Sequence, residues 1–316
     1  MNPKEKINLI YVASIGHSGS TLLESILGAH SQIATCGEIH IWPHEIADRG
    51  VMPCGCGESV LDCSFWNSMK QRINPLQQQS PSIHFFREQH NAGHTIRLNR
   101  IKEFGQSTVS PKIAQQIQTY GQNNYEVYAA FLKEMEQLEG HKFNWVVDAS
   151  KDPYRLLWLA RSGLFNIKVL HVVKNPRAFA YSMIKRLPKN EINLFHKRFY
   201  ETLRQSLKWS IENYLIDIVA QNHLNPADYL LVNYEQLASN PSETFRTVCN
   251  TVGCDFEIQA VENFREGSLH TIAGNPMRYQ SGGIYLDEKW KNLLPNFNRI
   301  VAEIATSINR KQYGYK

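Results

Sequence analysis

The sequence predicts an α/β protein with a mostly parallel central sheet flanked by helices, and three observations support this fold class. Short, apolar, β-branched segments alternate with helical patterns along most of the 316 residues, as they do where crossover helices connect parallel strands. A glycine- and hydroxyl-rich turn follows the first of these segments, and charged groups follow later ones. Because such sheets bind ligands at the carboxyl ends of their strands, we expect a binding site there.

The first strand is expected over 7–15, and a helix begins near Leu22. The turn between them reads Gly16-His17-Ser18-Gly19-Ser20-Thr21. Backbone N–H groups at such a turn, together with the helix dipole, favour a bound phosphate. A plain connecting turn is an equally good interpretation of these six residues alone. A nucleotide-kinase P-loop would also require a lysine, and none stands beside Gly19.

An acid and an imidazole follow shortly after this unit. Residues 32–35 form a second segment, which leads to Glu38 and His40. A glutamate held near a phosphate site can act as a general base. A salt-bridged surface glutamate and a packing histidine are the alternative.

Three cysteines lie close together at Cys54, Cys56 and Cys63. A complete zinc site needs four ligands. The nearby sequence offers three residues as the fourth: Cys36, His40 and His44. We favour a tight glycine-rich loop with small buried thiols, and we expect no bound metal.

Residues 66–143 are polar and rich in glutamine and asparagine, with a helical pattern over 124–138. We interpret this stretch as an insertion that shapes an acceptor pocket, with a surface excursion as the alternative. The α/β pattern resumes at Asn144. Strands are expected over 145–150, 168–173 and 229–234, and helices over 156–160, 176–186, 195–221 and 241–252. Four polar residues then fall at or just beyond strand ends: Thr21, Lys151, Lys174 and Tyr234.

Composition limits the class of protein. The formal net charge is +5 and the sequence pI is about 8.8, which suits an anionic ligand but is too small an excess for a nucleic-acid partner. There is neither a signal-peptide pattern nor a run of about 18 apolar residues. We therefore expect a cytoplasmic protein without a membrane segment, folded as a single domain over 1–316, whose oligomeric state the sequence does not predict.

Taken together, these separated motifs resemble those of the PAPS-dependent sulfotransferases, whose fold is related to the P-loop nucleotide kinases. PAPS is 3′-phosphoadenosine 5′-phosphosulfate, and PAP is its product. The likeness covers most of the chain. It is closest to bacterial members and, around the active site, to the tyrosylprotein and heparan-sulfate enzymes. It implies in-line transfer of a sulfuryl group from PAPS to a hydroxyl or amine, without a metal.

The resemblance also implies roles for individual residues. The turn over 16–22 corresponds to the loop that binds the 5′-phosphosulfate, and Tyr234 lies near the adenine. Lys174 and Ser182 occupy the positions of an arginine and a serine that hold the 3′-phosphate, and Arg278 belongs to a late loop that closes over the nucleotide. The implied cofactor-binding residues are Gly16, His17, Ser18, Gly19, Ser20, Thr21, Leu22, Lys174, Ser182, Tyr234 and Arg278.

The implied catalytic residues are Glu38, His40, His17 and Lys151, with Glu38 preferred over His40 as the base. Two positions depart from the family pattern. His17 stands where a lysine or arginine neutralises the bridging oxygen, and an imidazole does so fully only when protonated. Lys174 replaces an arginine, which keeps the charge but loses the bidentate fork.

The acceptor cannot be identified from the sequence, and we expect a small metabolite or natural product of secondary metabolism. Two other functions remain open at this point. One is a nucleotide-dependent phosphotransferase on the same fold. The other is a non-catalytic nucleotide- or zinc-binding module.

Overall fold

The computed structural model describes residues 5–42, 53–77, 101–266, 269–279 and 282–316. Its centre is a parallel five-stranded sheet in the order β2-β3-β1-β4-β5. The strands are β1 (Ile7–Ser14), β2 (Ile33–Thr35), β3 (Trp145–Lys151), β4 (Phe165–Val173) and β5 (Tyr229–Asn233). The α/β class with a mostly parallel sheet is thus confirmed, and the four strands predicted from the sequence are all present, while β2 falls within the segment 32–35.

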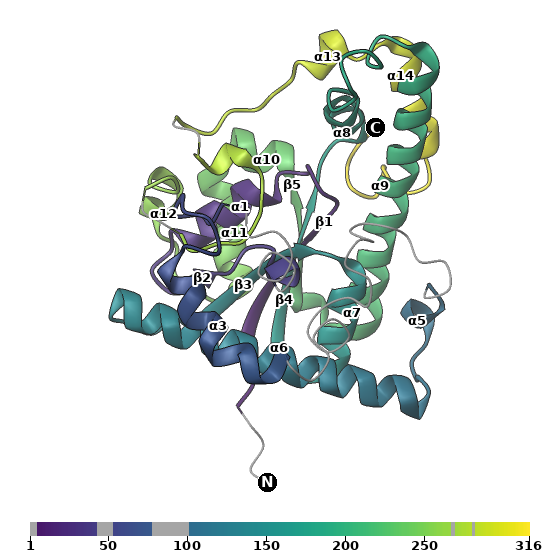
Figure 1. Cartoon of the computed structure of the whole chain (residues 1–316). Coiled ribbons are helices and arrows are strands. Elements are labelled where there is room, and N and C mark those ends of the chain that lie inside the picture. Colours follow the sequence, from purple (N-terminus) through teal and green to yellow (C-terminus); the bar gives the residue numbers. More distant parts are fainter. Residues whose placement is uncertain (1–4, 43–52, 78–100, 267–268, 280–281) are drawn as a thin grey trace.

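Helices cover both faces of the sheet (Figure 1). One face packs against α3 (Ser64–Gln77), α6 (Pro111–Glu139), α7 (Pro153–Ser162) and α9 (Phe195–His223). The other packs against α1 (Ser20–Gly28), α11 (Pro241–Val252) and α12 (Ile258–Glu262). Along β1, Leu9 and Tyr11 belong to the first layer and Ile10 and Val12 to the second. This two-residue alternation explains why a strand buried on both sides reads as a continuous apolar run.

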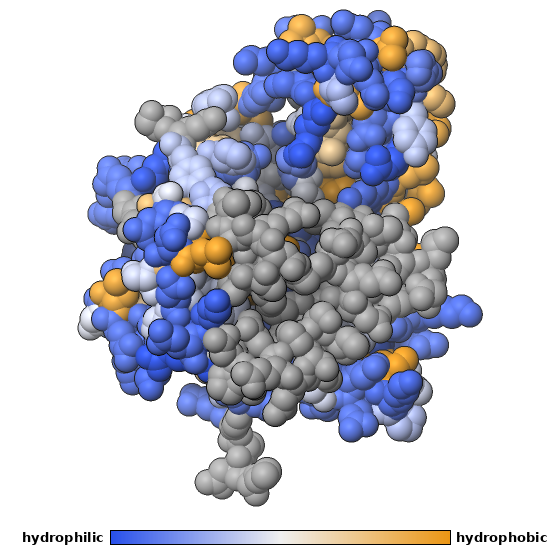
Figure 2. Space-filling view, viewed as in Figure 1, coloured by the Kyte–Doolittle hydropathy of each residue, from blue (hydrophilic) through white to orange (hydrophobic). Residues whose placement is uncertain are grey.

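A third group of elements lies beyond the carboxyl ends of the strands, at the top of Figure 1. It contains α8 (Pro176–Ile184), α13 (Trp290–Leu293) and α14 (Asn296–Ala305), and the short α10 (Tyr234–Ser239) follows β5 directly. Exposed hydrophobic side chains on α9 and α14 include Phe195, Phe297 and Ile304. Orange surface appears at the upper right of Figure 2, where Figure 1 places these two helices.

The described parts of the stretch 66–143, residues 66–77 and 101–143, are more helical and more deeply packed than their composition suggests. Helix α6 begins well before the predicted 124–138, at Pro111, because Ser110 accepts a hydrogen bond from the Ile113 N–H as its N-cap. Its residues Tyr120, Tyr128 and Phe131 are buried in the core. The described part also includes α5 (Lys102–Gly105). Among the helices that the structure describes, none is long and apolar enough to cross a bilayer.

A buried ion pair lies under the carboxyl end of β3. The Arg155 Nε donates to Asp148 Oδ2 at 2.8 Å, and neither side chain is exposed. Tyr120 and Tyr128 each accept a hydrogen bond from this guanidinium at 2.7 Å. The other carboxylate oxygen of Asp148 accepts from the Ser150 N–H at 2.8 Å. The network therefore holds the backbone that leads directly into Lys151.

Removing one partner of this pair should strongly destabilise the fold. Arg155→Met leaves the Asp148 carboxylate buried without its cation, so we expect a loss of about 3–5 kcal/mol in the free energy of unfolding. Urea denaturation measures it. Arg204→Met is the control, because Arg204 pairs with Glu201 at 3.3 Å while 57% exposed, and such pairs contribute under about 1 kcal/mol. Equal losses for the two variants would contradict the role assigned to the buried pair.

Candidate active site

The carboxyl ends of β1, β3 and β4 and the start of α10 line one cavity of about 670 Å³. Residues 274–277 of a late loop close its remaining side. A volume of this size accommodates a small-molecule ligand such as a nucleotide. The position matches the edge at which parallel sheets bind ligands.

The turn after β1 presents its backbone to this cavity. Gly16, His17, Gly19, Ser20 and Thr21 line it, and α1 begins at Ser20. Gly19 has a φ of 93°, and a Cβ there would lie 2.2 Å from the Tyr234 ring. Only glycine fits this position, because the tyrosine packs directly on the turn.

Two other members of the predicted phosphate loop have different surroundings. Ser18 is fully buried and is not among the lining residues. Leu22 packs in the hydrophobic layer beneath α1. The structure therefore brings five of the seven predicted turn residues to the cavity.

The same short pattern places a lysine at the end of each of two strands. In Lys151-Asp152-Pro153, the aspartate caps α7 by accepting from the Tyr154 N–H at 2.9 Å. In Lys174-Asn175-Pro176, the asparagine caps α8 by accepting from the Arg177 N–H at 3.0 Å. Both prolines occupy the first turn of the helix, where a missing N–H costs nothing. Each strand thus ends in a cation immediately before its helix, and both lysines line the cavity.

Lys174 lies where the sequence predicts a phosphate contact. Its Nζ is 3.5 Å from the Ser182 Oγ, eight residues along the chain, and 4.6 Å from the centre of the Tyr234 ring. Burial lowers the pKa of this lysine, although Glu235 opposes the shift. All three predicted residues, Lys174, Ser182 and Tyr234, therefore lie together at one end of the cavity.

Glu235 fixes that end in place. One carboxylate oxygen accepts from the Asn175 N–H at 3.0 Å, and the other accepts from the Tyr315 hydroxyl at 2.7 Å. The carboxylate therefore connects α10 to the turn that carries Lys174 and to the C-terminal segment. Its role is positional, since it is not among the cavity-lining residues.

Glu38 and Lys151 form an ion pair at the other end of the cavity, where both side chains are largely buried. Lys151 has a φ of 67°, an uncommon conformation for a residue with a side chain. The Glu38 N–H donates to Ile272 O at 2.8 Å, so the 270–273 segment holds Glu38 from outside the sheet. His40 belongs to the next turn, η1 (Ile39–Ile41), and does not line the cavity. Of the two residues predicted as candidates for the base, Glu38 alone is at the cavity.

His17 also has a strained backbone, at a φ of 70°. Its Nε2 contacts Arg186. Since a guanidinium can only donate, Nε2 must accept, and the imidazole proton lies on Nδ1. Burial, followed by the positive charge of Arg186, lowers the pKa of His17 to about 4. His17 is therefore neutral near pH 7, and it is not itself the cation of the phosphate loop.

Sequence reasoning missed Lys185 and Arg186, which follow α8 and line the cavity. Arg186 supplies the positive charge next to the loop that His17 lacks. The only signal was a pair of adjacent basic residues at a helix end. Sequence reasoning also did not single out Glu24 of α1, which lies outside this cavity: burial raises its pKa to about 7, and its carboxylate accepts from Thr35 Oγ1 at 3.1 Å.

Arg278 is not among the residues that line the cavity with Lys174. Its guanidinium donates to Thr271 Oγ1 at 2.8 Å and to Pro53 O at 3.0 Å. The loop that carries it does reach the cavity, because the Asn275 N–H donates to Thr21 Oγ1 at 3.2 Å. Arg278 thus secures this loop against residues 53 and 271, and its contact with a phosphate stays a prediction.

The three cysteines of the loop over 54–63 lie next to a histidine that the sequence does not suggest as a neighbour. Cys54, Cys56 and Cys63 gather around His270, and neither Cys36 nor His40 belongs to the group. Cys36 instead donates to Val147 O at 2.9 Å, and His44 lies outside the described residues.

Comparison with known proteins agrees with this geometry. Residues 10–257 match the model of a family described as the sulfotransferase family. The chain belongs to the sulfotransferase family. No curated protein matches it in a sequence comparison.

Solved structures show the same fold. A sulfotransferase domain from the Synechococcus PCC 7002 olefin synthase is 20% identical, with a TM-score of 0.56 over 100% of this chain and 98% of that one. A sulfotransferase domain from the curacin biosynthetic pathway is 16% identical, with a TM-score of 0.52 over 99% of each chain. The sulfotransferase STF9 from Mycobacterium avium is 8% identical, with a TM-score of 0.50 over 99% of this chain and 78% of that one.

The neutral state of His17 in this sulfotransferase can be measured directly. In the free protein, its imidazole should titrate in an NMR experiment with a midpoint near pH 4, below the usual value of about 6.5. An added anionic nucleotide should raise the midpoint, because negative charge favours imidazolium. The His17→Asn variant identifies the signal. A midpoint at or above 6.5 in the free protein would show that Arg186 and burial do not control this residue.

Proposed function

We propose that this sulfotransferase uses PAPS as donor and transfers its sulfuryl group in line to a hydroxyl or amine of a small acceptor. The observation that carries the proposal is that cations at the ends of β3 and β4, on either side of β1, line one cavity. Lys174 lies beside Ser182 after β4, Lys151 ends β3, and Arg186 contacts His17 in the turn after β1. A nucleotide with phosphates on both its 3′ and 5′ positions carries negative charge at two separate places, which these cations could bind.

The residues suit distinct parts of this donor. The turn over 16–21 and the start of α1 offer backbone N–H groups to the 5′-phosphosulfate. Lys174 and Ser182 would hold the 3′-phosphate from two sides. The Tyr234 ring, fixed against Gly19, would lie along the adenosine. These assignments use side chains that already line the cavity.

The transfer step follows from the charges at the other end. The acceptor oxygen or nitrogen attacks sulfur while the bond from sulfur to the bridging oxygen breaks, and PAP leaves with the bonding electrons. Lys151 and Arg186 stabilise the charge that grows on the leaving phosphate. The acceptor's proton passes to the carboxylate of Glu38. No redox change occurs, and one proton is released for each sulfate ester or sulfamate formed.

We further propose that the acceptor is a small metabolite or natural product, modified in the cytoplasm as part of secondary metabolism. One structural neighbour is a domain of the curacin biosynthetic pathway, and this name supports the substrate class by analogy. Residues 66–143 keep their proposed role in acceptor binding. None of the described residues in that stretch lines the nucleotide cavity.

Glu38→Gln tests the base. The amide keeps the shape of the side chain but cannot accept the proton, so kcat should fall by about 10²–10⁴-fold. Affinity for PAP should stay the same or rise, because Lys151 loses its anionic partner. Steady-state kinetics with labelled PAPS and calorimetry with PAP separate the two effects. His40→Ala is the matched control and should retain most activity, whereas loss of activity in His40→Ala alone would exchange the two roles.

Lys174→Ala tests the place of the 3′-phosphate. Loss of a charge-assisted hydrogen bond should weaken PAP binding by about 1.5–3 kcal/mol. Binding of adenosine 5′-phosphosulfate, which lacks the 3′-phosphate, should hardly change. Ser182→Ala removes a neutral partner and should cost less, about 0.5–1.5 kcal/mol. If calorimetry shows the two nucleotides weakened equally by Lys174→Ala, the 3′-phosphate binds elsewhere.

A further inference from the structure

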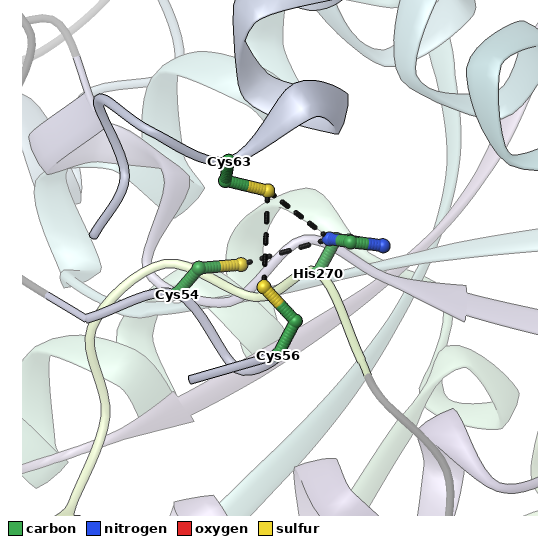
Figure 3. A group of neighbouring side chains, drawn as sticks. All are labelled: Cys54, Cys56, Cys63 and His270. Atoms are coloured by element: carbon green, nitrogen blue, oxygen red, sulfur yellow. Dashed lines mark hydrogen bonds between the residues drawn. The ribbon is translucent and has the colours of Figure 1, made fainter. Parts of the chain in front are cut away.

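Four potential metal ligands meet outside the nucleotide cavity (Figure 3). Cys54, Cys56 and Cys63 come from the loop that precedes α3, and His270 comes from the segment after α12. The His270 Nδ1 lies 3.3 Å from the Cys63 Sγ and 3.7 Å from the Cys54 Sγ. The Cys56 and Cys63 sulfurs are 3.8 Å apart, and all four ligand atoms lie within 4.8 Å of one another.

These separations match the edges of a zinc tetrahedron. With Zn–S bonds of about 2.3 Å and Zn–N bonds of about 2.0 Å, tetrahedral geometry puts two sulfurs about 3.8 Å apart and a sulfur and a nitrogen about 3.5 Å apart. A disulfide would instead require an S–S distance of about 2.05 Å. The side chains are therefore spaced for a shared ion rather than for a covalent bond between two of them.

We propose that Cys54, Cys56, Cys63 and His270 bind one zinc ion. Three thiolates and an imidazole form a Cys₃His set that suits zinc and leaves no open position, so the site is structural rather than catalytic. The proposal replaces the expectation, drawn from three cysteines alone, that the loop holds no metal. It is independent of the donor and acceptor proposed above.

The surroundings hold each ligand in place before any ion binds. Cys54 and Cys63 are fully buried. The His270 ring stacks on Phe65, with centroids 4.7 Å apart and planes within 7° of parallel. A Cβ on Gly55 would lie 2.1 Å from Leu269 O, so only glycine lets the loop approach the His270 segment so closely.

The site would connect to the nucleotide cavity through the segment after His270, which continues into the lining residues 274–277. The Gly55 N–H donates to Thr271 O at 3.0 Å, and Tyr279 donates its hydroxyl proton to Cys54 O at 2.8 Å. Two residues beyond His270, Ile272 O accepts from the Glu38 N–H at 2.8 Å. The zinc would thus cross-link the loop over 53–63 to the segment that holds Glu38, and its removal should loosen both.

A second, smaller group provides the matched control. His30, Cys249 and Cys254 also lie together, on the opposite side of the sheet. This group has only three ligands, and its histidine Nε2 already lies 2.8 Å from Asp255 O. A cysteine of this group can be changed without touching the proposed zinc site.

Metal analysis of untagged protein tests the proposal. Elemental mass spectrometry should find one zinc per chain, retained through gel filtration. Cys63→Ser should lower the zinc content at least tenfold, whereas Cys254→Ser should leave it unchanged. Substoichiometric zinc after incubation with zinc salt, or loss of zinc in Cys254→Ser but not in Cys63→Ser, would overturn the assignment.

A second measurement covers the case in which Cys63→Ser does not fold. Unaltered protein, stripped with a chelator and reloaded with cobalt(II), should show the absorption bands of tetrahedral cobalt with thiolate ligands. The stripped protein should also unfold at a lower temperature, and zinc should restore the original Tm. An octahedral cobalt spectrum, or a Tm that chelation does not change, would contradict a structural Cys₃His site.

Discussion

The buried pair of Asp148 and Arg155 determines where Lys151 lies, and the chemistry at one end of the cavity depends on it. Asp148 receives the guanidinium on one oxygen and the Ser150 N–H on the other. The chain must then turn within one residue, and Lys151 adopts a left-handed φ of 67°. Packing around a buried ion pair can hold such a strained residue. The ammonium of Lys151 thereby faces Glu38 instead of continuing along the strand.

Positive charge reaches the cavity from separate elements, and each cation has its own support. Lys174 ends β4 and is held by the asparagine cap and by Glu235. Arg186 follows α8 and contacts the neutral His17 of the turn after β1. With these charges fixed before a donor binds, the proposed transfer would need little reorganisation as negative charge develops on the leaving phosphate. A histidine in the loop is then compatible with catalysis, because the cation comes from another part of the chain.

The sequence predicts those parts of this site whose residues lie close together along the chain. Three consecutive residues contain the end of a strand, the helix cap and the start of the helix in both Lys151-Asp152-Pro153 and Lys174-Asn175-Pro176. Ser182 follows the second of these, two helical turns later. Contacts between distant segments could not be predicted. Arg186 meets His17 across 169 residues, and His270 meets Cys63 across 207. No regular spacing in the sequence indicates that the residues of either pair are in contact. The hydrogen bond from Arg278 to the distant Pro53 could not be predicted for the same reason.

The central claim is that the cavity recognises a phosphate on the 3′ position. Calorimetric titration of the unaltered protein with PAP and with adenosine 5′-diphosphate tests it most directly, because the two nucleotides carry two phosphates each and differ in where the second one is attached. Lys174 and Ser182 predict tighter binding of PAP, by about tenfold or more, as expected for a charge-assisted hydrogen bond. The account also predicts that magnesium does not reverse this order. Equal affinities, or tighter binding of the diphosphate with magnesium, would contradict the claim and favour phosphoryl transfer.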